Sequence, residues 1–155
     1  MRKVTLKFTI SGNNKNKILV KAEQSSLYRH LEVLHLWCLE VFENAPKHPM
    51  VRADIRLLAE NIVQAQSAVA MALNTDNLNQ KFDFLDVVVM SMTNIKSITK
   101  VLSEYSSNSD RGNHVISKPQ RVRLLDIMHQ IGNELGRWRN KTAAQIRQKA
   151  ADLPK

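Results

Sequence analysis

Apolar residues recur every three or four positions through most of this chain, and polar breaks divide that pattern into four long segments. This spacing places the apolar side chains on one side of an α-helix, so each segment predicts an amphipathic helix. The chain has only four Gly and four Pro, too few for the many tight turns of a sandwich or barrel. We therefore predict an all-α fold, an up-down-up-down four-helix bundle with an N-terminal β-hairpin extension.

Residues between the segments set the expected helix boundaries. Ser25 or Ser26 suits the N-cap of the first helix and Asp76 or Asn77 that of the third, because their side-chain oxygens accept from unpaired backbone N–H groups. Pro119 suits the first position of the fourth helix, where an N–H group is not needed. The expected helices run from 25 or 26 to 44, from 51 to 74, from 78 to 106, and from 119 to at least 139, with 151 as the furthest end.

Two of these helices have apolar residues beyond a narrow stripe. In the first helix, further apolar residues widen the stripe, so we expect this helix to be buried on more than one side; they are Val33, Leu36, Trp37, Leu39 and Phe42. In the fourth helix, the expected core-facing positions are Val122, Leu125, Met128, Ile131, Leu135 and Trp138.

The beginning of the chain has a different pattern. Apolar Val4, Leu6, Phe8 and Ile10 alternate with Lys and Thr, which is the period of a β-strand with one buried face. Turn-forming residues follow, and a less regular alternation then resumes. An isolated two-stranded hairpin is marginal in water, so we expect this segment to pack on the bundle, on another subunit or on a partner.

The chain accordingly divides into three parts. We expect a basic hairpin-like extension at 1–24, the four-helix bundle at 25–141, and a basic C-terminal helix extension or tail at 142–155.

Positive charge is concentrated at the two ends of the chain. Lys and Arg number 23 against 14 Asp and Glu, a formal net charge of +9. Residues 1–24 carry a net charge of +5, residues 25–116 carry −2, and residues 117–155 carry +6. Clustered cations favour a polyanionic partner, because binding to phosphates releases condensed counterions.

The expected fourth helix supplies the candidate contacts to such a partner. Its basic residues surround the helix rather than forming one narrow stripe. Contacts of this type position phosphates without identifying bases, and few aromatic residues are available for stacking, so we expect binding that is not sequence-specific. The candidate nucleic-acid-binding residues are Arg121, Arg123, Arg137, Arg139, Lys141, Arg147 and Lys149.

Two glycines lie four positions apart within the same segment. Gly costs about 1 kcal/mol relative to Ala inside a helix, so Gly132 and Gly136 favour the close approach of another helix. Trp138 follows two positions later, where it can close one end of the bundle.

Most patterns that carry catalytic chemistry are missing from the sequence. It has no Gly-rich phosphate loop, no His-Glu-x-x-His zinc motif and no nucleophile elbow. Its five His do not form the paired Glu-x-x-His motifs of di-metal bundles. The single Cys, Cys38, excludes a disulfide framework, and its place on the apolar stripe predicts a small buried side chain. We therefore expect no catalytic residue, no metal and no other cofactor.

One pattern nevertheless suggests an enzyme as an alternative. Arg123 and His129 have an Arg-x(5)-His spacing that resembles the catalytic motif of HEPN-type ribonucleases, which are also helical bundles. Arg29 and His35 repeat that spacing. Motifs of that family typically have a polar residue directly after the Arg, whereas this chain has Leu124.

The sequence shows no sign of a membrane segment. No apolar run approaches the roughly 20 residues that a helix needs to cross a bilayer. The basic N-terminus is not followed by the apolar stretch of a signal peptide. We therefore expect a cytoplasmic protein without membrane contact.

Several residues together resemble a known family. The resemblance covers about residues 27–141, and its most specific part is Ile131–Trp138, with the pattern Ile-Gly-x-x-Leu-Gly-x-Trp. The family is the group of four-helix-bundle proteins that contains the accessory variability determinants of diversity-generating retroelements and the proteins of ribosomal intervening sequences. The other matching features are Trp37, the Pro-containing link Ala45–Pro49, Arg52 with Ile55, and Lys81 with Leu85.

The resemblance implies a non-enzymatic basic protein that assembles as a barrel-like homopentamer. In the retroelement branch, such a protein binds the reverse transcriptase, RNA and DNA, and is required for mutagenic copying of template RNA into cDNA. The strong positive charge of this chain favours that branch. The alternative is a binding module of the ribosomal-intervening-sequence type with another partner. Residues 3–22 depart from the family pattern.

Overall fold

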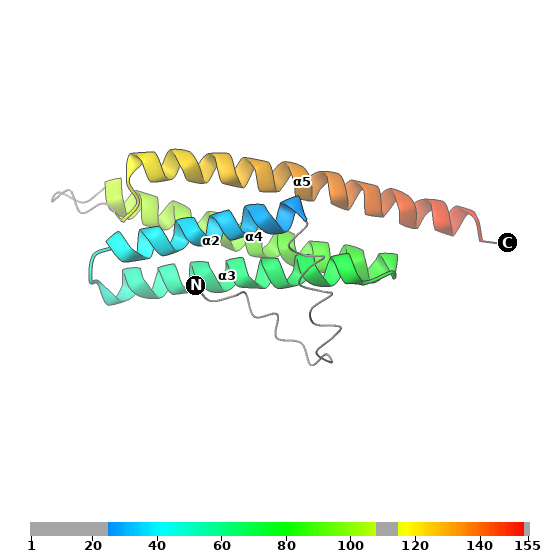
Figure 1. Cartoon of the computed structure of the whole chain (residues 1–155), viewed down its shortest axis with the longest axis horizontal. Helices are drawn as coiled ribbons and strands as arrows, with labels where there is room; N and C mark the ends of the chain where they lie inside the picture. Colours follow the sequence, from blue (N-terminus) through cyan, green and yellow to red (C-terminus); the bar gives the residue numbers. More distant parts are fainter. Residues whose placement is uncertain (1–24, 108–114, 154–155) are drawn as a thin grey trace.

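The computed structural model describes residues 25–107 and 115–153, and all regular structure in these residues is helical (Figure 1). The described part fits the expected four-helix bundle, and successive helices run in opposite directions (Figure 1). The predicted N-terminal hairpin lies outside the described residues. The helices are α2 (Ser26–Asn44), α3 (Pro49–Asn74), α4 (Leu78–Ser107) and α5 (Lys118–Ala151).

The helices pack in a ring that follows their order in the chain. α3 packs against α2 on one side and against α4 on the other. α5 packs against α4 and closes the ring by packing on α2. The first and the last of the described helices therefore contact each other.

Side-chain caps confirm the predicted starts of α2 and α4, and a cap one residue earlier than expected starts α5. The hydroxyl of Ser25 accepts a hydrogen bond from the backbone N–H of Tyr28 at 3.4 Å. Asn77 Oδ1 accepts from the N–H of Gln80 at 3.1 Å at the start of α4. α5 begins with a complete capping box at Ser117, which satisfies two backbone donors at once.

Three boundaries differ from the predicted ones by one or two residues: the start of α3, the end of α4, at Ser107 rather than 106, and the start of α5, at Lys118 rather than 119. α3 begins at Pro49 rather than at residue 51, because His48 acts as its N-cap and its Nδ1 accepts from the N–H of Met50 at 3.2 Å. α5 continues without a break through Lys141 to Ala151, the furthest end that the sequence allowed.

The core draws large apolar side chains from all four helices. Fully buried examples are Leu34 on α2, Ile62 on α3, Leu85 on α4 and Ile131 on α5. Cys38 is buried as expected, and its thiol lies 3.7 Å from the backbone oxygen of Ile55. Burial raises the pKa of this thiol to about 12.

Two expectations about the core are wrong. Trp37 is buried and Phe42 packs against the core, but Val33, Leu36 and Leu39 are 46%, 48% and 40% exposed, so α2 is buried along one side only. On α5, Val122 and Leu125 are 61% and 65% exposed, and the buried position is Leu124 instead. The core-facing line of α5 is therefore rotated from the predicted one at the start of the helix and agrees with it at Ile131 and Leu135.

Within the described residues, no helix is both long enough and apolar enough to cross a membrane.

Candidate nucleic-acid interface

The C-terminal half of α5 extends beyond the first turn of α2. The hydroxyl of Ser26, at the start of α2, donates a 2.9 Å hydrogen bond to Glu134 Oε1 in the middle of α5. From Glu134 to Ala151, α5 continues for about 25 Å at 1.5 Å per residue. Figure 1 shows this end of α5 projecting past the other helices. Along this stretch, α2 therefore does not cover the side of α5 that it covers nearer the N-terminal end of α5.

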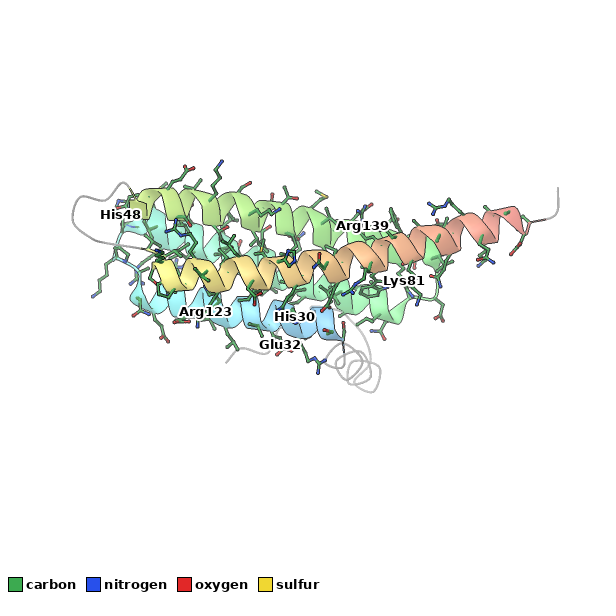
Figure 2. All side chains as sticks on the ribbon, turned by 90° about the horizontal axis from the view of Figure 1, so that it is seen from above. His30, Glu32, His48, Lys81, Arg123 and Arg139 are labelled. Atoms are coloured by element: carbon green, nitrogen blue, oxygen red, sulfur yellow. The ribbon has the colours of Figure 1, made fainter. Side chains whose placement is uncertain are left out.

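His30 helps to define the point where α2 ends on α5. Its Nδ1 lies 2.8 Å from Glu134 Oε1, at ion-pair distance, although the direction does not satisfy a hydrogen bond. Figure 2 shows His30 beside α5, close to the start of α2. Ser26 and His30 of α2 therefore both contact Glu134. Glu134 is the last acidic side chain of α5.

The helix beyond Glu134 is strongly cationic. No Asp or Glu occurs between Glu134 and Asp152, while the same stretch carries five Lys and Arg. Four of these cations are exposed, and no ion pair identified in the described part of the chain involves them. They are Arg137, Lys141, Arg147 and Lys149.

The remaining predicted cations of α5 divide into two groups. Arg139 contacts Asp86 Oδ1 on α4 at 2.5 Å, and its guanidinium lies 5.1 Å from the centre of the Phe82 ring. Arg123 forms an ion pair with Glu40 on α2. These two arginines connect α5 to α2 and α4. Figure 2 shows where they lie along α5. Arg121 is exposed, but it lies about 24 Å along the helix from Arg137.

The structure therefore does not bring the seven predicted residues together on one surface. Arg137 and Lys141 project about 40° apart around the helix axis, whereas Arg147 and Lys149 project in other directions. α2 does not pack against this end of α5, so the backbone of a nucleic acid could contact the helix from several directions. Lys81, half-buried near the start of α4, lies at the same end of the bundle as Arg139 (Figure 2).

Two hollows lie near this end of the bundle. One, of about 630 Å³ at the α3–α4 connection, is lined by Asp76 and Asp83, whose charges repel phosphate. The other, of about 290 Å³, lies between the start of α4 and the end of α5 and includes Lys149. Neither hollow could be predicted from the sequence, since each depends on how α4 is placed against its neighbours.

The two glycines of α5 do not serve the packing that we expected. A Cβ atom at Gly132 or Gly136 would meet nothing within 4 Å. No other described helix of this chain therefore approaches closely there, and the expected close approach is not found among the described residues.

The residues of the proposed ribonuclease motif are separated. Six positions along a helix correspond to about 120° around its axis, so Arg123 and His129 project in different directions. Arg123 pairs with Glu40, while His129 Nε2 lies 3.2 Å from the side-chain nitrogen of Asn133. Arg29 and His35 are separated by the same angle. The described residues contain no group of three His, Cys, Asp or Glu side chains suited to a metal ion.

No protein-family model, curated protein or solved structure matches this chain.

Proposed function

We propose that this protein binds nucleic acid through the C-terminal half of α5. The observation that carries the proposal is the acid-free stretch between Glu134 and Asp152, with its four exposed cations outside the identified ion pairs of the described residues. Lys and Arg side chains around one helix suit phosphates in several directions, and their clustering increases counterion release. The proposed contacts are mainly to the backbone of RNA or DNA, with little selection of base sequence.

The resemblance of the sequence extends this proposal to a biological role. We propose a non-enzymatic accessory protein of a diversity-generating retroelement, an oligomeric scaffold that binds the reverse transcriptase and the template RNA or cDNA. The four-helix arrangement and the positive charge are compatible with that role. The separation of Arg123 from His129 gives no support to the ribonuclease alternative.

A pair of charge-matched variants tests the nucleic-acid surface. In the first, Arg137, Lys141, Arg147 and Lys149 are changed to Gln. In the control, four exposed cations elsewhere in the bundle are changed to Gln, so both variants lose four positive charges. The control positions are Lys47, Arg56, Lys96 and Lys100. Arg123 and Arg139 stay unchanged in both variants, because their ion pairs connect the helices.

The measurement is fluorescence anisotropy of a labelled single-stranded RNA, titrated at several salt concentrations. Each phosphate contact to a single strand contributes about −0.7 to the slope of log K against log salt, so losing four contacts reduces the slope by about 3. We expect that reduction in the α5 variant and much less in the control. Equal weakening of both variants would assign binding to overall charge, and unchanged binding by the α5 variant would exclude this surface.

The proposed assembly has its own test. Light scattering after size exclusion, in salt high enough to remove nucleic acid, gives the mass in solution. A mass near five chains supports the retroelement role, and the next step is co-purification with a reverse transcriptase encoded beside this chain. A monomer or dimer contradicts the scaffold.

A further inference from the structure

α2 has a line of apolar side chains on the side away from the core. Val33, Leu36 and Leu39 occur every three residues and are about half exposed, whereas Leu31 and Leu34 on the opposite side are fully buried. None of the other described helices covers this line, which we call the outer strip of α2. Exposed apolar side chains that gather along one helix often mark a contact with another segment or protein.

The outer strip lies among acidic residues. α2 carries Glu32, Glu40 and Glu43 but only one cation, Arg29, so its net charge is −2 with His neutral. Glu40 is paired with Arg123 of α5. Glu32 projects from α2 at the margin of the bundle (Figure 2). An occupant of the strip should therefore combine apolar side chains with positive charge.

We propose that residues 3–10 of the same chain dock on the outer strip of α2. In this segment Val4, Leu6, Phe8 and Ile10 alternate with polar residues, so an extended backbone would present all four apolar side chains to one surface. Residues 1–24 carry a net charge of +5, opposite in sign to α2. The segment thus has both properties that the strip requires.

The connection between the two is long enough for docking within one chain. Leu36 lies about 15 Å along α2 from Ser26, at 1.5 Å per residue. The 14 residues from 11 to 24 span at most about 50 Å when extended. The required distance is therefore well within the reach of this connection, so docking within one chain is sterically possible.

Charge distinguishes this strip from the other exposed apolar side chains. Val122 and Leu125 on α5 lie close in sequence to Lys118 and Arg121, which would repel Lys3 and Lys7 of the docking segment. Val101 on α4 follows Lys100 directly. Of the four described helices, α2 is the one with a net negative charge, since α3 and α4 are neutral and α5 carries +6, so α2 attracts a cationic segment most strongly.

Docking would change the surface charge on the side of the protein that α2 forms. With the apolar side chains against α2, the alternating Lys3 and Lys7 would face solvent. An apolar and acidic surface would then present positive charge. This inference does not depend on the proposed nucleic-acid binding, and its test uses no nucleic acid.

Disulfide trapping in the full-length chain tests the proposal. One variant combines Phe8→Cys with Leu36→Cys, and the control combines Phe8→Cys with Val101→Cys, an exposed position on α4. Cys38 stays in both, because it is buried. At low micromolar concentration with a mild oxidant, we expect at least a tenfold higher yield of intrachain disulfide in the first variant, measured by non-reducing electrophoresis and peptide mapping. Circular dichroism confirms that both are folded.

Two outcomes would overturn the proposal. Similar yields in the two variants would show that residue 8 has no preference for α2. A disulfide that forms mainly between chains would show that the occupant comes from a second copy.

In a further variant, Glu32→Lys with Glu43→Lys, we expect the intrachain yield to fall several-fold. The control, Glu60→Lys with Glu104→Lys at exposed positions on α3 and α4, should leave the yield unchanged. An equal effect of both pairs would contradict the charge argument.

Discussion

The indole Nε1 of Trp37 donates a 2.9 Å hydrogen bond to the backbone oxygen of Gln120, joining the middle of α2 to the first turn of α5. The same Gln120 completes the capping box of α5, because its side chain accepts from the N–H of Ser117. One residue thus both starts α5 and connects it to α2. The contact joins helices that are separated in the chain by α3 and α4.

We expect Trp37→Phe to lower the free energy of unfolding by about 1–3 kcal/mol. The change removes one hydrogen bond, worth about 1 kcal/mol, and leaves a small cavity beside a buried ring. Urea unfolding followed by far-UV circular dichroism measures the effect. Trp138→Phe is the control, since Trp138 is only half-buried, and a larger loss there than at Trp37 would contradict the prediction.

Gln66 offers a stabilising substitution. Its side chain is fully buried on α3, and neither Oε1 nor Nε2 has a hydrogen-bond partner among the residues that the structure describes. A buried amide without partners costs about 1–3 kcal/mol, so we expect Gln66→Leu, which is similar in size, to stabilise the protein by about that amount. The urea midpoint should rise for Gln66→Leu but not for Gln64→Leu, because Gln64 is exposed. A destabilised Gln66→Leu variant would mean that the amide has a partner.

The glycines of α5 allow a test that separates helix propensity from packing. Because a Cβ atom at Gly132 or Gly136 has open space, we expect each Gly→Ala change to stabilise the protein by up to about 1 kcal/mol. Thermal unfolding at low protein concentration measures this gain. Destabilisation instead would show that another helix, from a second copy, approaches the backbone at this point.

Local signals in the sequence were sufficient to predict the helices. Caps such as Ser25 and Asn77 act within one turn, so their effect does not depend on the rest of the fold. The face that each helix buries depends on its neighbours. Leu124 and Leu125 are adjacent and equally apolar, and only the positions of α2 and α4 decide that Leu124 is the buried one.

The candidate interface was only partly predictable for a similar reason. Its cations were visible as residues in the sequence, but their partners were not. Arg123 pairs with Glu40, 83 positions away, and Arg139 pairs with Asp86, 53 positions away. The projection of the C-terminal half of α5 beyond α2 also depends on tertiary packing, because the contact between Ser26 and Glu134 sets where α2 ends along α5.

The pH dependence of stability should include a contribution from His35. Burial lowers the pKa of this side chain in the folded protein from its ordinary value of 6.5. The unfolded chain therefore binds a proton at a higher pH than the folded protein does, so stability present above pH 6.5 is lost as the pH falls toward the lowered pKa. We expect the urea midpoint to fall between pH 7.5 and 5.5, and less steeply in His35→Gln. Equal slopes in the two proteins would contradict the prediction.

Cys38 should be protected from alkylation in the folded protein. Its thiol is buried between α2 and α3, and with a pKa of about 12 only about one molecule in 10⁴ carries the reactive thiolate at pH 8. Reaction with iodoacetamide therefore requires these helices to separate, so we expect very slow labelling in buffer and rapid labelling in urea, measured by mass spectrometry. Ser97→Cys in a Cys38→Ala background provides an exposed comparison on α4 and should react rapidly in buffer. Labelling of Cys38 at the same rate as Cys introduced at position 97 would show that the α2–α3 contact opens readily.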